Sequence, residues 1–232
     1  MATRRGAIWL VLAVLATAGA WATAAAALRH GLQAQTGLHI AVSPYAIDFL
    51  DGKDLVTTYH IDPGLSKPYF WPLNTPSGVG VTRDWPMARA KPGEQTDHVH
   101  QKSGWFTHGD VIPEGMTLKH KTKGAQGVDF WSEEDGHGFI LCTKVSEAQQ
   151  SKEQTRIVTD NEWLTADGEK IMDEKRMISL YDLGAEVGGA RLLVVDSDLS
   201  ADVCPITFGD TKEGSFGVRV RTDLTEEKGK GV

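Results

Sequence analysis

Short strand-like runs recur along almost the whole chain, and this pattern constrains the fold more than any other feature. Apolar, β-branched and aromatic residues gather in runs about 10 residues apart, separated by Gly, Asp and Pro. No amphipathic helix of about 15 residues is visible, so the crossover helices of a parallel sheet are missing. The sequence therefore predicts an all-β fold of antiparallel strands, a sandwich or a barrel. The predicted strands are His39–Val42, Ala46–Leu50, Leu55–Ile61, Lys67–Leu73, Val79–Thr82, Val128–Ser132, Phe139–Val145, Thr155–Trp163, Lys170–Tyr181, Ala190–Leu199 and Gly214–Val220.

Two local patterns sharpen this prediction. The step Asp51-Gly52 lies between two apolar runs, and an Asp-Gly step in that setting predicts a β-hairpin. The run Lys170–Tyr181 alternates, and in its C-terminal half Ile178 and Leu180 share one apolar face. A strand with one apolar face is expected to cover a core on that side only.

The N-terminus has the three parts of a secretory signal. Arg4 and Arg5 form a short basic region, Ala7–Ala20 is apolar, and Ala20-Trp21-Ala22 fits a small-x-small cleavage site. An uncleaved anchor helix is the alternative, but the apolar run is short for a membrane span and rich in Ala. We predict a cleaved signal and a periplasmic or extracellular protein.

The domain organisation follows from that signal. The predicted parts are a signal peptide at 1–26, a linker at 27–37 and a β-sandwich domain at 38–232.

Net charge limits the partners that this protein can bind. Signal removal lowers the net charge from −7 to −9, because Arg4 and Arg5 leave with it and no acidic residue does. Nucleic-acid binding and polybasic membrane attachment both need a basic surface. We expect a small-molecule partner, no nucleic acid, and no membrane after signal cleavage; the sequence identifies no cofactor.

The two cysteines leave two alternatives open. Cys142 and Cys204 can form a disulfide in an oxidising compartment, or they can remain separate buried thiols. Neither has a Cys or His neighbour at the spacing of a metal site.

A histidine cluster lies in the one long irregular stretch, 83–127. If Val99 belongs to a strand, His98 and His100 project to the same face and can serve as acid and base or as metal ligands. His108 and Asp110 form a second such pair if their segment is extended. Asp97 or Asp110 can orient an imidazole. The alternative is a solvated polar loop.

A second polar cluster runs from Gly209 to Gly217. Asp210, Lys212 and Glu213 can form a general base beside a lysine or bind a pair of sugar hydroxyls; the alternative is an ordinary hairpin turn. The pair Arg83-Asp84 can bind a ligand or form a buried ion pair. Four tryptophans flank these clusters and can stack on a sugar or belong to the core; they are Trp71, Trp85, Trp105 and Trp131.

Five motifs occur in a fixed order: Val81-Thr82-Arg83-Asp84-Trp85-Pro86, Asp97-His98-Val99-His100, Trp105-Phe106-Thr107-His108-Gly109-Asp110-Val111, Val128-Asp129-Phe130-Trp131 and Gly209-Asp210-Thr211-Lys212-Glu213-Gly214-Ser215-Phe216-Gly217. Together they resemble a known bacterial family, the PmoA-like family (DUF6807), which carries the label "methane oxygenase PmoA". The resemblance covers about Lys67–Val220. It implies a β-sandwich domain, often exported and often found near sugar-catabolism genes, and it does not imply methane oxidation.

The chain departs from that family at three places. Where members read Asp-His-Pro-His-His-Arg, Val99 replaces the proline and Gln101-Lys102 replace His-Arg, so one candidate ligand or acid is missing. The stretch Pro113–Ala125 is inserted before the Asp-Phe-Trp motif. Family domains continue beyond the point where this chain stops at Val232, so the resemblance implies that C-terminal strands are missing.

Three functional hypotheses remain. The first is a carbohydrate-related protein that resembles the mutarotase-like supersandwich folds, in which a His protonates the ring oxygen and Glu213 takes the hydroxyl proton. The second is a cupin-like metal-dependent oxygenase using His98 and His100, although a cupin's later glutamate is Gly104 here. The third is a non-catalytic binding protein with a decayed site. The candidate catalytic residues are His98, His100, His108 and Glu213, and the candidate substrate-binding residues are Arg83, Asp97, Trp105, Asp110, Asp210 and Lys212.

Overall fold

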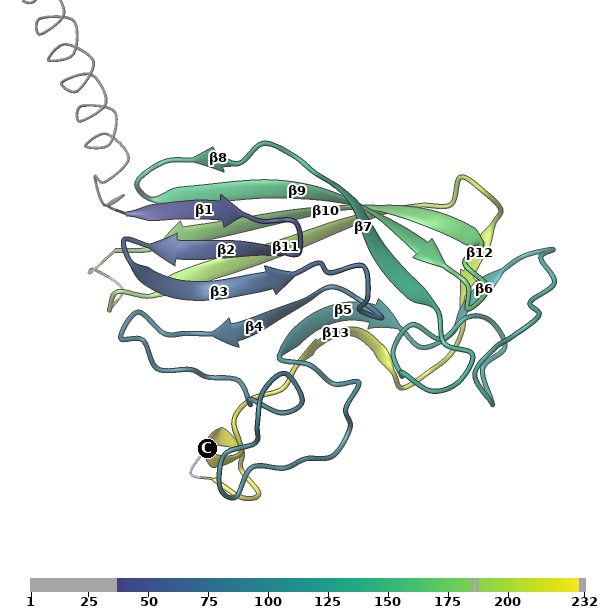
Figure 1. The fold of residues 1–232 in the computed structure, drawn as a ribbon, viewed down its shortest axis with the longest axis horizontal. Coiled ribbons are helices and arrows are strands. Elements are labelled where there is room, and N and C mark those ends of the chain that lie inside the picture. The colour runs from purple at the N-terminus through teal and green to yellow at the C-terminus, as the bar shows by residue number, and fades with distance from the viewer. Residues whose placement is uncertain (1–36, 185, 187, 230–232) are drawn as a thin grey trace, which may run out of the picture. The chain divides into compact units, whose positions relative to one another are not determined.

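The computed structural model describes residues 37–184, 186 and 188–229, and this part of the chain is built almost entirely from β-strands (Figure 1). The predicted signal peptide and nearly all of the predicted linker lie outside the described residues. No helix among the described residues is long and apolar enough to cross a membrane. The elements are β1 (Leu38–Val42), β2 (Ala46–Asp51), β3 (Asp54–His60), β4 (Tyr69–Leu73), β5 (Gly104–His108), β6 (Val111–Pro113), β7 (Phe139–Val145), β8 (Gln149–Gln150), β9 (Gln154–Leu164), β10 (Lys170–Asp182), β11 (Arg191–Ser200), β12 (Ile206–Phe208), β13 (Gly214–Val218) and the short 3-10 helix η2 (Thr222–Leu224).

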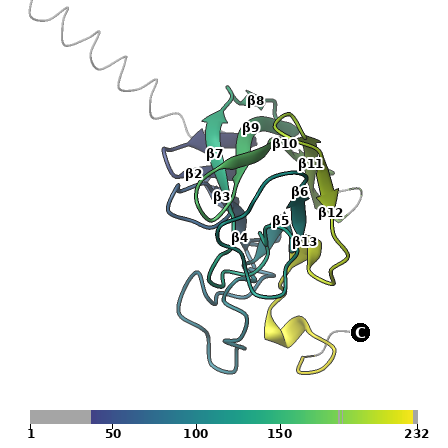
Figure 2. The ribbon, with the colours of Figure 1, turned by 90° about the vertical axis from the view of Figure 1, so that its right-hand side faces the viewer.

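The strands form two antiparallel layers, which confirms the predicted β-sandwich. The first layer has the order β1-β2-β3-β4-β5-β13, and the second has the order β11-β10-β9-β7, with β8 paired to β9. A small third sheet pairs β12 with β6, and Figure 2 shows it beside β5 and β13. The predicted Asp51-Gly52 hairpin is present, because Gly52 has a positive φ of 57° and β2 pairs with β3 across it.

The two layers do not end at the same place. Figure 1 shows the six-stranded sheet, coloured blue to yellow, continuing through β4, β5 and β13 past the last strand of the other layer, β11. The six-stranded layer therefore overhangs the other layer on one side.

An apolar core fills the space between the layers. One cluster gathers around Ile47, Phe49 and Ile178, and another around Phe130 and Trp163. Where these clusters meet, Arg176 of β10 is bound by Glu174 at 2.7 Å and by the Tyr59 hydroxyl at 2.7 Å. Because Tyr59 belongs to β3, this buried network joins the two layers.

Sequence reasoning placed some strands wrongly. Val128–Ser132 is not a strand, because the Asp129 carboxylate accepts the backbone N–H groups of Trp131 and Ser132 and bends the chain. Val79–Thr82 makes only isolated bridges. Val99 lies in a turn, in which the Gln101 N–H binds the His98 carbonyl, and the irregular stretch contains strands β5 and β6.

The cysteines remain separate in the structure. Cys142 and Cys204 are both free thiols, and burial raises the pKa of Cys142 to about 11. The Cys142 side chain packs against the core cluster around Ile47, Phe49 and Ile178, whereas Cys204 contacts Met116 at 3.7 Å.

Candidate functional site

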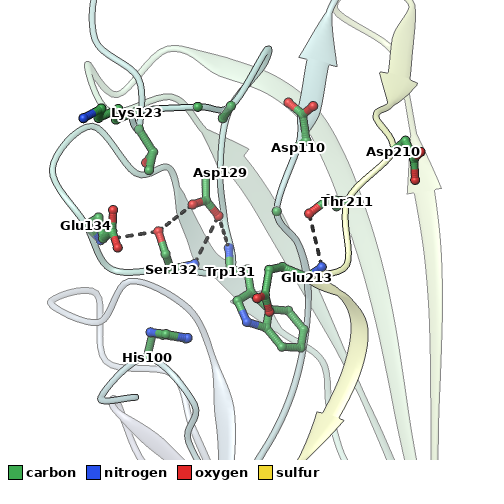
Figure 3. A pocket seen from close by; sticks show the side chains of 14 residues that line it. His100, Asp110, Lys123, Asp129, Trp131, Ser132, Glu134, Asp210, Thr211 and Glu213 are labelled. Atoms are coloured by element: carbon green, nitrogen blue, oxygen red, sulfur yellow. Dashed lines mark hydrogen bonds between the residues drawn. The ribbon is translucent and has the colours of Figure 1, made fainter. Parts of the chain in front are cut away.

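One polar pocket lies at the end of β5 and the start of β13. It has a volume of about 300 Å³ and draws its lining from five separate segments of the chain. Figure 3 shows carboxylates, an imidazole and an indole gathered around it. The lining residues are His100, Gly109, Asp110, Thr122, Lys123, Gly124, Ala125, Asp129, Trp131, Ser132, Glu134, Asp210, Thr211 and Glu213.

Trp131 forms the apolar part of this pocket. Its ring packs on Trp105 with centroids 5.0 Å apart, and both belong to a cluster on the sheet face opposite the sandwich core. Trp105 and Phe106 point to opposite faces because neighbouring strand residues alternate. The indole N–H of Trp131 is buried and has no hydrogen-bond partner among the described residues.

The segment that carries Trp131 is held from below by a buried lysine. Lys67 is fully buried and donates to the Trp131 carbonyl at 2.6 Å, and it lies 3.3 Å from a Glu133 oxygen. Burial lowers the pKa of Lys67 to about 8, and the charge of Glu133 opposes part of this effect. Ser66 and Lys102 also bind Glu133, so the turn has several fixed contacts.

The Asp97–Gln101 segment is held by two arginines. The buried Arg83 donates to the carbonyls of Asp97, His98 and Gln101 and to the Asp97 carboxylate. Arg219 binds the same carboxylate at 2.8 Å. Partial burial opposes ionisation, but hydrogen bonds from His98, Arg83 and Arg219 hold the pKa of Asp97 well below its usual range.

His100 is the histidine that this segment places in the pocket. His98 is mostly exposed, has a positive φ of 48° and binds Asp97 at 2.8 Å, whereas His100 lines the cavity. The two rings meet edge to face with centroids 5.6 Å apart. Burial, followed by the charges of Lys67 and His98, lowers the pKa of His100, which therefore favours the neutral ring at pH 7.

The opposite wall comes from the ends of β5 and β13. The Gly109 N–H donates to the Glu213 carbonyl at 2.7 Å, and the Asp110 carboxylate accepts the Gly127 N–H at 2.6 Å. Gly209 is needed here, because a Cβ at that position would overlap the Asp110 carboxylate. These contacts bring Asp110 and Glu213 to the same cavity as His100.

The structure thus assembles some predicted residues and separates others. His100, Asp110, Asp210 and Glu213 share the pocket, as Figure 3 shows. The remaining predicted residues lie outside its lining. Arg83 and Asp97 hold the His100 segment, Trp105 lies buried against Trp131, His98 adjoins His100, Lys212 has a side chain 90% exposed, and His108 packs against Phe208 with ring centroids 5.2 Å apart.

Several pocket residues were not predicted as site residues. Asp129, Ser132 and Glu134 lie in the turn after Val128, which the apolar pattern had assigned to a strand. The sequence signal for this turn is Asp129 itself. An aspartate favours turns because its carboxylate can accept backbone N–H groups two and three residues later. No sequence pattern indicates that Lys67 is buried beneath the pocket, because its burial depends on tertiary contacts.

Metal-ligand geometry is absent from the part of the chain that the structure describes. No group of three or more His, Cys, Asp or Glu side chains there is arranged to hold an ion. A cupin-like centre on His98 and His100 would require a third such ligand.

Comparison with known proteins gives a family. A family model described as "Family of unknown function (DUF6807)" matches residues 46–232. This chain belongs to the DUF6807 family. The match spans every strand from β2 to β13 and therefore includes the whole pocket. No curated protein and no solved structure matched the chain significantly, so the family itself is the extent of the likeness.

Proposed function

We propose that the pocket binds a neutral sugar and that His100 and Glu213 catalyse the opening and closing of its ring. One observation carries this proposal: the Trp131 side chain lines one cavity with His100 and Glu213 (Figure 3). An indole offers a sugar a face on which its ring can stack.

The charges of the pocket favour a neutral ligand. Carboxylates outnumber cationic groups in the lining, and carboxylates accept hydrogen bonds from hydroxyl groups while repelling anions. The acidic residues are Asp110, Asp129, Glu134, Asp210 and Glu213, and the basic residues are His100 and Lys123.

The reaction requires one base and one acid. Glu213 takes the proton from the anomeric hydroxyl while protonated His100 gives a proton to the ring oxygen. The bond between the anomeric carbon and the ring oxygen breaks, and a carbonyl forms. Return of the two protons after rotation of the carbonyl closes the ring to the other anomer, so atoms and charges balance over the cycle.

We also propose that the protein lies outside the cytoplasm. Its support is the basic, apolar and small-residue pattern of residues 1–26. N-terminal sequencing of the protein from its natural host tests it: we expect a start near Thr23 or Ala27, and an intact Met1 on a membrane-bound form would contradict it.

Sugar binding can be tested at the Trp131 indole. A panel of neutral reducing sugars is titrated into the ¹⁵N-labelled protein, and the indole resonance is assigned with Trp131→Phe. We expect one or more sugars to shift this resonance. If none of them shifts it, the sugar-binding proposal is wrong.

Catalysis can be tested separately by polarimetry of anomer exchange. We expect Glu213→Gln to lower the rate by about 100-fold or more, because general acid–base catalysis contributes at least that factor, while binding of the sugar is retained. Glu147→Gln is the matched control, since Glu147 is exposed in the turn before β8 and remote from the lining. Binding without accelerated exchange would instead indicate a sugar-binding module.

A further inference from the structure

Two irregular segments of the backbone carry the imidazole and the indole into the pocket (Figure 3). His100 comes from the segment 97–101, and Trp131 comes from the segment 129–134. Neither segment belongs to a β-strand, so no ladder of backbone hydrogen bonds joins one to the other. Contacts made by side chains must therefore set the distance between the two segments.

A chain of three charged side chains links the segments. Lys102 Nζ donates to the Val99 carbonyl at 2.9 Å and to Glu133 Oε2 at 3.0 Å. The other carboxylate oxygen of Glu133 lies 3.3 Å from Lys67 Nζ, which donates to the Trp131 carbonyl at 2.6 Å. The chain therefore begins at the backbone of one segment and ends at the backbone of the other.

The contact between Lys102 and Glu133, here called the Lys102–Glu133 bridge, is largely shielded from water. The two side chains are 13% and 21% exposed, so solvent screens their attraction less than at an open surface. Ser66 donates to the carboxylate at 2.7 Å as well. Burial opposes ionisation of Glu133, but the charges of Lys67 and Lys102 and the hydrogen bond from Ser66 hold its pKa below the usual range. The bridge therefore contains a charged carboxylate at neutral pH.

We propose that the Lys102–Glu133 bridge is a positioning device, which fixes the spacing between the acid and the stacking face of the pocket. Neither residue belongs to the lining, so the bridge acts on a ligand only through the segments that it joins. This inference rests on the proposed function, in which a sugar stacked on Trp131 presents its ring oxygen to His100. A misplacement of about 1 Å between such groups can cost about 100-fold in rate.

Amide hydrogen exchange tests the bridge without any ligand. Lys102→Met removes the bridge from the side of the segment 97–101, and we expect exchange in the opposite segment, 129–134, to become about tenfold faster or more, because a partly buried hydrogen bond between charged groups is lost. Glu133→Gln is expected to speed exchange in 97–101 in the same way. An effect that crosses from one segment to the other is what a bridge predicts.

Polarimetry of anomer exchange tests the consequence for catalysis. We expect Lys102→Met and Glu133→Gln each to lower kcat by about tenfold or more with KM changed less than about threefold, because the sugar still stacks while the acid is misplaced. The double variant is expected to lose no more than the weaker single variant, since each substitution breaks the same bridge. Circular dichroism confirms that each variant folds, and Lys102→Gln replaces Lys102→Met if that variant does not.

An ion pair remote from the pocket supplies the matched controls. Lys175 and Asp160 lie 3.7 Å apart on β10 and β9, with side chains 65% and 40% exposed. Lys175→Met and Asp160→Asn are expected to leave exchange in both pocket segments and the rate of catalysis unchanged.

The outcomes separate the bridge from the proposed function. Faster amide exchange across the bridge, together with a loss of kcat that does not multiply in the double variant, supports the proposal. Amide exchange that changes only in the segment carrying the substitution overturns it, and so do losses of kcat that multiply. A wild type without anomer exchange overturns the proposed function instead, and amide exchange alone then decides whether the bridge holds the two segments.

Discussion

Single buried charges set the shape and the chemistry of the candidate site. Arg83 and Lys67 donate mainly to backbone carbonyls, so each fixes a chain segment instead of a ligand. The segments that they fix carry His100 and Trp131 into the cavity. A buried donor is costly to remove, since it leaves its acceptors without partners.

The pH dependence of catalysis is expected to follow His100. Its pKa is lowered by burial and by the charges of Lys67 and His98, so the protonated ring that the proposed reaction requires is scarce at pH 7. Lowering the pH therefore populates the acid, and we expect the rate of anomer exchange to rise as the pH falls below 7. Polarimetric rates across a pH series measure this. A rate that falls steadily below pH 7 would contradict the assignment of His100 as the acid.

The stability of the fold is expected to depend on pH through Lys67. Its pKa falls from an ordinary value of 10.5 to about 8 in the folded protein, so the unfolded chain holds more protons between these values and the folded state gains stability as pH rises through them. The gain is on the order of 3 kcal/mol at about 1.4 kcal/mol per pKa unit. Urea unfolding of the wild type and of Lys67→Met at pH 7.5 and 10.5 measures the difference, which is expected to change by this amount. A constant difference would show that Lys67 titrates normally.

At the scale of elements, the strands were more predictable than the segments between them. The hairpin at Asp51-Gly52 and the alternation of Lys170–Tyr181 are local patterns, and the structure reproduces both. β5 was missed because its inward and outward sides are both apolar, with Trp105 and Phe106 facing different clusters. The placement of His108 away from the pocket depends on strand parity, which could not be assigned before β5 was located.

The pocket was predictable only in part for a related reason. The two polar clusters could be recognised from composition, and the structure brings His100 to Glu213. The contacts that do so join residues far apart in the sequence, such as Arg219 with Asp97. No local pattern reveals such contacts.

Replacing Arg83 is expected to release the His100 segment. Arg83→Lys retains the charge but cannot reach the three carbonyls that the planar guanidinium binds together. We expect a loss of about 3–5 kcal/mol in the free energy of unfolding, as for other buried charges that lose partners. Arg89→Lys is the control, because Arg89 is exposed in the same irregular stretch. An equal effect of both substitutions on urea unfolding would contradict this role.

At the scale of the whole molecule, a polar network joins the two layers. Arg176 binds Glu174, the Tyr59 hydroxyl and the Phe106 carbonyl, and its attraction to Tyr59 and Glu174 holds its own pKa above the usual value despite burial. Glu174 also accepts the indole N–H of Trp163 at 3.0 Å. Strands from both layers thus meet at one cation.

Removing that cation is expected to destabilise the sandwich as a unit. Arg176→Met leaves Glu174 buried and without its cation, so we expect about 3–5 kcal/mol of lost stability. Lys175→Met, at the neighbouring position on the exposed face of β10, is expected to change stability by less than about 0.5 kcal/mol. Thermal or urea unfolding measures both, and a variant Arg176→Met as stable as the wild type would show that the network contributes no net stability.

The anchoring of the pocket has a consequence for how this protein can diversify. The anchors, Arg83 and Lys67, are sealed beneath the surface, whereas Asp210, Lys123 and Glu134 reach the cavity from loops that the core does not depend on. Substitutions in those loops can therefore exchange one ligand preference for another at little risk to folding. Relatives with the same sandwich are expected to keep the two anchors and to differ at these loop positions. A directed-evolution library is therefore best aimed at the loop positions.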